Sequence, residues 1–153
     1  MLVADEPTGS LDSTTQNEIL SLFQSLRQKY GLAIILITHN PSLLVGLADR
    51  ILILYAGRVA EIGPTESIFS SPLHPYTRAL LQCLPPLLSG ADEVNRKKML
   101  PVISGDSPTS TLLTQACRFE PRCPDRFEVC GKREPTAVSL TNGHTVSCFK
   151  FGG

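Results

Sequence analysis

The first twelve residues constrain the possible fold most strongly. Four apolar residues, 1–4, run directly into Asp5 and Glu6, and a turn of small residues then leads to a third carboxylate, Asp12. A short apolar run of this kind is typical of a strand that is buried in a parallel sheet. In open α/β sheets, ligands bind at the carboxyl ends of the strands, where Asp5 and Glu6 would lie. The sequence therefore predicts an α/β fold with a carboxylate site at that end of its sheet.

A second apolar run, Gly31–Thr38, predicts another buried strand, and His39 follows it directly. The segment between the two strands predicts a helix that Asp12 or Ser13 caps and that ends near Tyr30. The inner side of this helix would carry Ile19, Leu20, Leu22, Phe23 and Leu26. Taken alone, an Asp-Glu pair could simply cap a helix, and a lone histidine is more often a capping or packing residue.

The longer string around the carboxylates is more specific. Asp-Glu-Pro-Thr at residues 5–8, followed by Leu-Asp at 11–12, resembles the Walker B motif and D-loop of ABC-type ATPases. His39 matches the switch histidine of that family in position. The sequence departs from the family at Gly9 and Ser10, where Thr or Ser and then Ala are more usual. The resemblance implies a partial RecA-like sheet with helices.

The same resemblance implies a role for each polar residue at this site. Asp5 would hold Mg²⁺ beside ATP, and Glu6 would activate the attacking water as general base. His39 would contact the γ-phosphate, and Asp12 would lie at the junction of two subunits and couple their sites. These four residues are the predicted ATP-handling residues of the intact subunit.

Two motifs of an active ATPase are missing from the chain. ATP binding needs a glycine-rich loop, G-x-x-x-x-G-K-[ST], whose N–H groups surround the phosphates, and no such string occurs. The Leu-Ser-Gly-Gly-Gln signature, which precedes the Walker B strand in the family, does not occur either. The resemblance is therefore to the later part of an ATPase, and the chain alone is expected not to hydrolyse ATP.

Further along, residues 51–55 and 58–62 predict a hairpin, and short helices are expected after Pro41 and Pro64. Residues 1–70 carry seven acids and four Lys or Arg, whereas residues 71–153 carry seven acids and ten Lys or Arg. The alternation of predicted strands and helices is also weaker in residues 71–153. We therefore divide the chain into two domains, 1–70 and 71–153. The string His-Pro-Tyr-Thr-Arg-Ala-Leu-Leu at 74–81 resembles the C-terminal extension of ATP-binding subunits of oligopeptide and dipeptide ABC importers, a group that includes nickel importers.

Four cysteines near the end of the chain form a second candidate site: Cys117, Cys123, Cys130 and Cys148. In a cytosolic protein such a set favours metal binding over disulfides. Their spacing, C-x5-C-x6-C-x17-C, does not distinguish zinc from an iron–sulfur cluster. The surrounding residues resemble the tail of the same importer subunits, which implies a [4Fe–4S] cluster, with Zn²⁺ as the alternative. The extension is otherwise expected to be mostly irregular, with Cys83 buried and His144 in a turn after Asn-Gly.

The composition narrows the functional classes. The formal net charge is zero, which gives no electrostatic case for nucleic acid, and no apolar run approaches the ~20 residues of a membrane span. No basic segment precedes an apolar one at the N-terminus, so no secretory signal is expected. The resemblance implies a cytoplasmic protein at the inner face of the cell membrane, with a second ATP-binding subunit, permease subunits and, indirectly, a solute-binding protein as partners. The alternative is a stand-alone iron–sulfur or zinc-binding regulatory fragment without catalysis.

Overall fold

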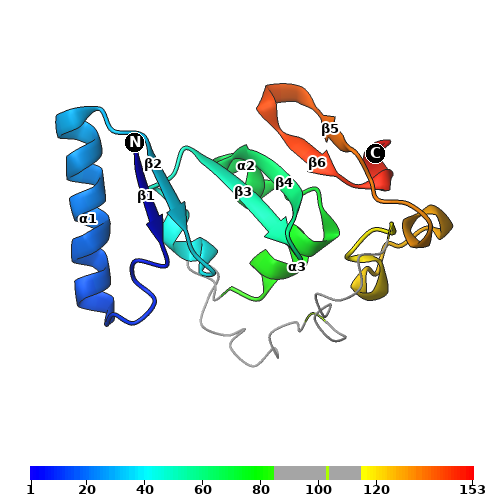
Figure 1. The fold of residues 1–153 in the computed structure, drawn as a ribbon, viewed down its shortest axis with the longest axis horizontal. Coiled ribbons are helices and arrows are strands. Elements are labelled where there is room, and N and C mark those ends of the chain that lie inside the picture. The colour runs from blue at the N-terminus through cyan, green and yellow to red at the C-terminus, as the bar shows by residue number, and fades with distance from the viewer. Residues whose placement is uncertain (85–102, 104–114) are drawn as a thin grey trace, which may run out of the picture. The chain divides into compact units, whose positions relative to one another are not determined.

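The computed structural model describes residues 1–84, 103 and 115–153, which form two compact units, Met1–Leu47 and Ala48–Gly153. Figure 1 shows both units as ribbons. Each contains strands and helices, so the described chain is mixed α/β. The division between the units falls after Leu47, whereas the sequence analysis divides the chain after residue 70. The two divisions differ because residues 58–64 pair with a strand near the C-terminus, which joins them to the second unit.

The first unit is a βαβ arrangement. Strands β1 (Leu2–Asp5) and β2 (Ile34–Ile37) pair in parallel, and helix α1 (Ser13–Tyr30) connects them. The Asp12 carboxylate accepts hydrogen bonds from the first N–H groups of α1 and so caps it. Gly31 ends the helix in the left-handed region at φ 61°, as glycine commonly does. Both predicted strands and the connecting helix are therefore found, together with the predicted helix ends.

The burial of this unit differs from the prediction. Alternate residues of β1 and β2 are half-buried, but Val3, Ile35 and Ile37 are about half exposed, at 54%, 49% and 47%. This alternation is that of a sheet with one covered face, not of a strand buried on both. On α1, four of the five predicted inner residues are half-buried, and Leu22 is exposed. Part of the apolar surface of this unit is therefore left exposed by its own helix and strands.

The second unit is built on an antiparallel sheet of order β3-β4-β6-β5. Its strands are β3 (Arg50–Tyr55), β4 (Arg58–Pro64), β5 (Ala137–Ser139) and β6 (Thr145–Ser147). Ala56 and Gly57 both have positive φ and join β3 to β4 in a two-residue turn, as the sequence predicts for this hairpin. The sequence analysis missed β5 and β6, which make the C-terminal extension part of the sheet.

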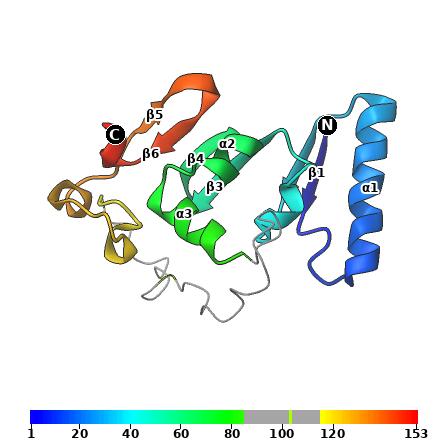
Figure 2. The same ribbon diagram turned by 180° about the vertical axis from the view of Figure 1, so that it is seen from behind.

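Helices α2 (Thr65–Ser70) and α3 (Pro75–Gln82) follow β4 (Figure 2). His74 caps α3 through Nδ1, which accepts the Tyr76 N–H at 3.0 Å. Short 3₁₀ helices make up most of the remaining described structure: η1 (Pro41–Leu44), η3 (Glu120–Arg122), η4 (Glu128–Gly131), η5 (Thr141–Gly143) and η6 (Phe149–Phe151). The short helix predicted after Pro41 is therefore present, as a four-residue helix of the 3₁₀ type.

The core of the second unit lies along one face of β3 and β4. Ile51, Ile53 and Tyr55 alternate inward along β3, and the fully buried Val146 lies on β6. An aromatic cluster extends this core, since the rings of Tyr76 and Phe119 lie 4.6 and 5.1 Å from that of Tyr55. The extension is thus packed on the hairpin by apolar burial. Within the described residues, no helix is both long and apolar enough for a membrane span.

Candidate functional site

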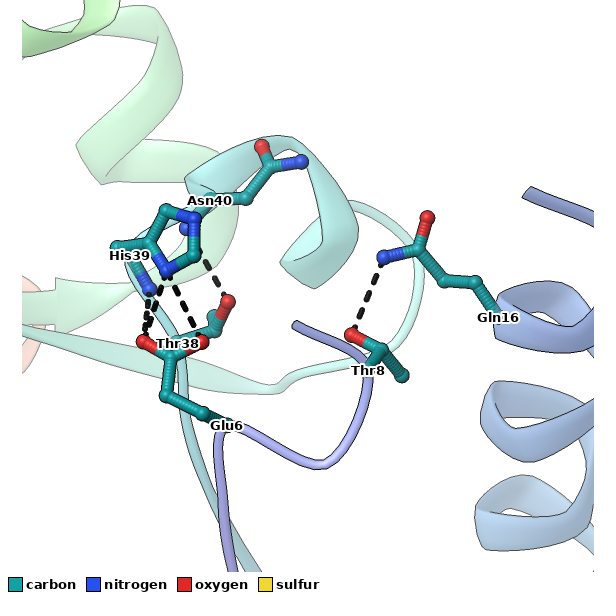
Figure 3. A network of polar contacts seen from close by, with 6 residues as sticks. All are labelled: Glu6, Thr8, Gln16, Thr38, His39 and Asn40. Atoms are coloured by element: carbon teal, nitrogen blue, oxygen red, sulfur yellow. Dashed lines mark hydrogen bonds and ion pairs between the residues drawn. The ribbon is translucent and has the colours of Figure 1, made fainter. Parts of the chain in front are cut away.

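The parallel register of β1 and β2 brings two of the predicted site residues into contact (Figure 3). Asp5 pairs with Ile37, and the Glu6 N–H continues the ladder by donating to the Ile37 carbonyl at 2.9 Å. The Glu6 carboxylate accepts the backbone N–H of His39 at 2.9 Å through Oε1. The His39 Nδ1 lies 2.9 Å from both carboxylate oxygens. Residues 33 positions apart in the sequence thus form one polar pair at the carboxyl ends of adjacent strands.

This pair is open to solvent. The side chain of Glu6 is 41% exposed, and that of His39 is 79% exposed. An exposed pair of this kind adds little to folding stability. A ring protonated at Nδ1 donates to the carboxylate, and its Nε2 then points away from it. An exposed carboxylate beside an imidazole is able to accept a proton from a substrate or a water molecule.

The loop after Glu6 holds this carboxylate in an uncommon backbone conformation. Glu6 has φ 45°, in the left-handed region that residues other than glycine seldom adopt. The Glu6 carbonyl accepts the Gly9 N–H at 3.2 Å, which closes a turn. Thr8 is buried, and its Oγ1 accepts a hydrogen bond from Gln16 of α1 at 3.1 Å (Figure 3). Sequence reasoning missed Gln16, since a glutamine in a helix carries no motif signal by itself.

The structure places the other two predicted carboxylates apart from this pair. Asp5 ends β1 and is exposed. Asp12 caps α1, where the N–H and hydroxyl of Thr15 hold the pKa of its carboxyl below the usual value. The cap therefore keeps Asp12 ionised and fixes the end of the loop that begins at Glu6. Of the four predicted ATP-handling residues, Glu6 and His39 touch, while Asp5 and Asp12 bracket the same loop.

The four predicted cysteine ligands are neighbours in the second unit. Cys117 and Cys130 meet through the backbone, where the Cys117 N–H donates to the Cys130 carbonyl at 2.9 Å. The Cys148 thiol is close enough to those of Cys117 and Cys123 to contribute to the raised pKa of each, and Cys130 contributes in the same way to the pKa of Cys148. The Phe127 N–H donates to the Cys130 sulfur at 3.3 Å. All four are free thiols.

Burial raises the pKa of Cys117, Cys123 and Cys148, that of Cys123 to about 11. These three thiols are therefore protonated at neutral pH unless a cation binds them. Among the residues that the structure describes, no three His, Cys, Asp or Glu side chains converge closely enough to hold one metal ion. The thiols form a neighbourhood of donors but not a closed site for a single ion.

The structure adds to one expectation about the extension and corrects another. His144 follows the turn that contains Asn142 and Gly143, as expected, and its side chain is buried, with Nε2 2.6 Å from Oε1 of Glu61. Cys83 is half-buried at the end of α3, not fully buried as expected. Sequence reasoning missed Glu61, which is wholly buried. Its position among apolar residues of β4 was the signal that could have revealed a buried carboxylate.

Comparison with known proteins places these features in a family. Residues 60–130 match the family model of the oligopeptide/dipeptide transporter C-terminal region. The chain is 38% identical over 151 residues, 99% of its length, to the oligopeptide transport ATP-binding protein AppD of Bacillus subtilis. It is 41% identical over 150 residues, 97% of its length, to the dipeptide transport ATP-binding protein DppD of the same organism.

The matched segments make up 44% of AppD and 43% of DppD, so the chain spans less than half the length of these relatives. The similarity nevertheless extends over both structural units. The family model matches β4, α2 and α3 and continues to Cys130. The chain therefore belongs to the oligopeptide/dipeptide transporter family of ATP-binding proteins, of which it carries the C-terminal region.

Proposed function

We propose that this chain is the segment of a peptide-type ABC importer ATPase that activates water for ATP hydrolysis and couples this step to solute uptake. The observation that carries the proposal is the contact between Glu6 and His39 at the ends of two parallel strands. Residues 1–70 would belong to a RecA-like ATPase domain, and residues 71–153 to the importer-type extension. The names of AppD and DppD support peptides as the transported class.

In this proposal Glu6 is the general base. Each carboxylate oxygen has two lone pairs, so the contacts to His39 leave at least one lone pair to accept a proton from water. The backbone N–H of His39 fixes the Glu6 carboxylate, and Nδ1 selects its orientation. His39 directs Nε2 away from Glu6, where a protonated ring can donate to a γ-phosphate oxygen. Asp5, an exposed oxygen donor at the end of β1, would hold Mg²⁺.

Asp12 would act between subunits. It ends the loop that begins at Glu6 and is fixed there by its hydrogen bonds to α1. A second ATP-binding subunit that contacts this loop would sense the position of Glu6, so that the two sites are coupled. Because the sequence contains no glycine-rich phosphate loop, we propose that the chain alone does not hydrolyse ATP. Permease subunits at the inner face of the cell membrane and a solute-binding protein would complete the importer.

A hybrid protein tests this function. This chain replaces the matching segment of DppD, and ATP binding and hydrolysis are measured for the hybrid, for Glu6→Gln and for Glu18→Gln. Glu18 is an exposed residue of α1 and provides a matched control. We expect the Glu6→Gln hybrid to bind ATP and to lose hydrolysis by roughly 10²–10⁴-fold, the range for a positioned general base. Normal hydrolysis by the Glu6→Gln hybrid would refute the assignment.

We also propose that the four cysteines bind a [4Fe–4S] cluster. The donor set fits such a cluster, because four free thiols lie in the same part of the second unit, with Cys130 buried and the other three half-buried. A cluster is held by one thiolate on each iron, so its ligands stand further apart than those around one tetrahedral Zn²⁺. The resemblance of the residues around the cysteines to the tail of importer subunits is what favours the cluster over Zn²⁺ in this proposal. When bound, the cluster would supply a redox-active or structural centre.

Anaerobic reconstitution tests the cluster. The chain is incubated with ferrous iron and sulfide, and in parallel with Zn²⁺, and bound metal is measured after desalting. We expect about four irons per chain with visible charge-transfer absorption, and loss of both in Cys130→Ser. If the chain retains one Zn²⁺ and no iron, the site is a zinc site and the cluster assignment is wrong. A chain that retains neither metal would refute the cysteine site.

A further inference from the structure

A buried carboxylate outside both candidate sites connects three parts of the second unit. Glu61 of β4 is wholly buried, and Oε1 accepts the Leu73 N–H at 2.8 Å while Oε2 accepts the His74 N–H at 2.9 Å. These two N–H groups precede α3. Oε1 also lies 2.6 Å from Nε2 of His144, which follows η5. A carboxylate in this environment is tolerated only because both oxygens are hydrogen-bonded.

The backbone beside Glu61 has a slot for the His144 ring. A Cβ added to Gly63 would lie 3.0 Å from Cδ2 and 3.2 Å from Cγ of His144, which is too close for ordinary contact. The absence of a side chain at Gly63 therefore admits the ring, and Glu61 binds its far nitrogen. We call Glu61, Gly63 and His144 the Glu61 anchor.

The anchor is linked to the cysteines by short stretches of chain. His144 directly precedes β6, and Cys148 directly follows it. On its other side, Glu61 fixes the backbone of His74, whose ring lies 5.8 Å from that of Phe119. Phe119 is buried and lies two residues after Cys117. The same carboxylate thus contacts the segment that leads to Cys148 directly, and it is linked to the segment that holds Cys117 through His74 and Phe119.

We propose that Glu61 and His144 are positioning residues for the four-cysteine site. The hydrogen bond between them sets the start of β6 and so the place of Cys148 beside Cys117 and Cys123. Docking of the extension on β4 and assembly of the thiols are then a single event. The effect on metal binding rests on the proposed cluster, but the position of Cys148 can be measured in the metal-free chain.

The test uses the whole chain and three variants. His144→Phe keeps a ring in the slot of Gly63 and removes the donor to Glu61. His144→Gln restores an N–H donor on a side chain of similar reach and is the conservative rescue. Ser139→Ala is the matched control, because Ser139 is exposed on the neighbouring β5 and makes one hydroxyl contact to Thr145.

Two readouts separate positioning from general support of the fold. Mass spectrometry measures the alkylation rate of Cys148 relative to Cys83 in the metal-free chain. Amide hydrogen exchange measures protection of the ladder between β3 and β4. For His144→Phe we expect a roughly tenfold faster relative alkylation of Cys148, which corresponds to ~1.4 kcal/mol, with the ladder still protected. His144→Gln and Ser139→Ala are expected to match the unmodified chain.

Three results would overturn the proposal: an unchanged alkylation rate of Cys148 in His144→Phe, no rescue by His144→Gln, or a joint loss of protection throughout the ladder. The last result would reduce the anchor to a purely structural role. The reconstitution with ferrous iron and sulfide is repeated on the same variants, where lower iron retention in His144→Phe alone is expected. If the unmodified chain binds no iron, the cluster fails as a proposal, and the alkylation rates still decide the role of the anchor.

Discussion

Truncation of Val146 tests the unexpected strand pairing between the extension and the hairpin. Val146 is wholly inaccessible to solvent on β6 and pairs with Glu61 across the ladder to β4. Val146→Ala removes two methyl groups, which is ~1.6 kcal/mol of lost burial at ~0.8 kcal/mol for each carbon. A residual cavity of roughly 50 Å³ adds about 1 kcal/mol. We therefore expect unfolding of the second unit to cost roughly 2–3 kcal/mol less.

Urea unfolding measures this loss. Two of the three tyrosines, Tyr55 and Tyr76, pack in the second unit, whereas Tyr30 on α1 is 60% exposed, and the chain has no Trp. The change in tyrosine fluorescence on unfolding therefore reports mainly on the second unit. With m near 1–3 kcal/mol/M, the midpoint should fall by about 0.7–3 M. Val59→Ala on β4, where the side chain is 39% exposed, is the control and should shift the midpoint much less. Equal shifts in the two variants would refute the pairing of β6 with β4.

Three further changes have defined outcomes. Asp12→Ala should expose the amides of Thr14 and Thr15 to faster hydrogen exchange, because the carboxylate that accepts from them is lost. In the unmodified chain, the protection of these amides should persist at neutral pH and be lost as the pH falls below 3.8, through the lowered pKa of Asp12. Burial lowers the pKa of His74 from 6.5 to about 4, so on acidification the unfolded chain takes up a proton before the folded chain does. The stability of the second unit should therefore fall as the pH is lowered from 6.5 to 4. In His74→Asn, the urea midpoint should depend less on pH across that range. Thr77→Val should raise the urea midpoint or leave it unchanged, because the hydroxyl of this wholly buried side chain has no hydrogen-bond partner among the described residues.

The first unit was predictable because its signals are local. The apolar runs at residues 2–5 and 34–37, the cap at Asp12 and the stop at Gly31 each specify an element without long-range information. The adjacency of Glu6 and His39 then follows from parallel pairing. The exposure of Val3, Ile35 and Ile37 was not predictable, since an apolar run indicates a capacity for burial and not its extent.

The second unit shows why the rest was missed. Strands β5 and β6 have three residues each, too short for a clear alternation. The two strands pair with each other, and the other partner of β6, strand β4, lies more than 80 residues earlier in the chain. The number of cysteines near the end of the chain predicted them as a set, but the contact between Glu61 and His144 depends on that distant pairing. The sequence showed Asn142 and Gly143 as a turn, whereas burial of the next side chain required the tertiary fold.

The most direct test of the proposed function is the identity of the nucleotide retained by the DppD hybrid. The Glu6→Gln hybrid is mixed with ATP and Mg²⁺, rapidly desalted, and its bound nucleotide is separated and measured. We expect retained ATP, because the contacts that bind nucleotide remain while the proton acceptor at Glu6 is lost. The unmodified and Glu18→Gln hybrids should release ADP and phosphate. ADP formed by the Glu6→Gln hybrid at the unmodified rate would contradict the assignment of Glu6 as the base.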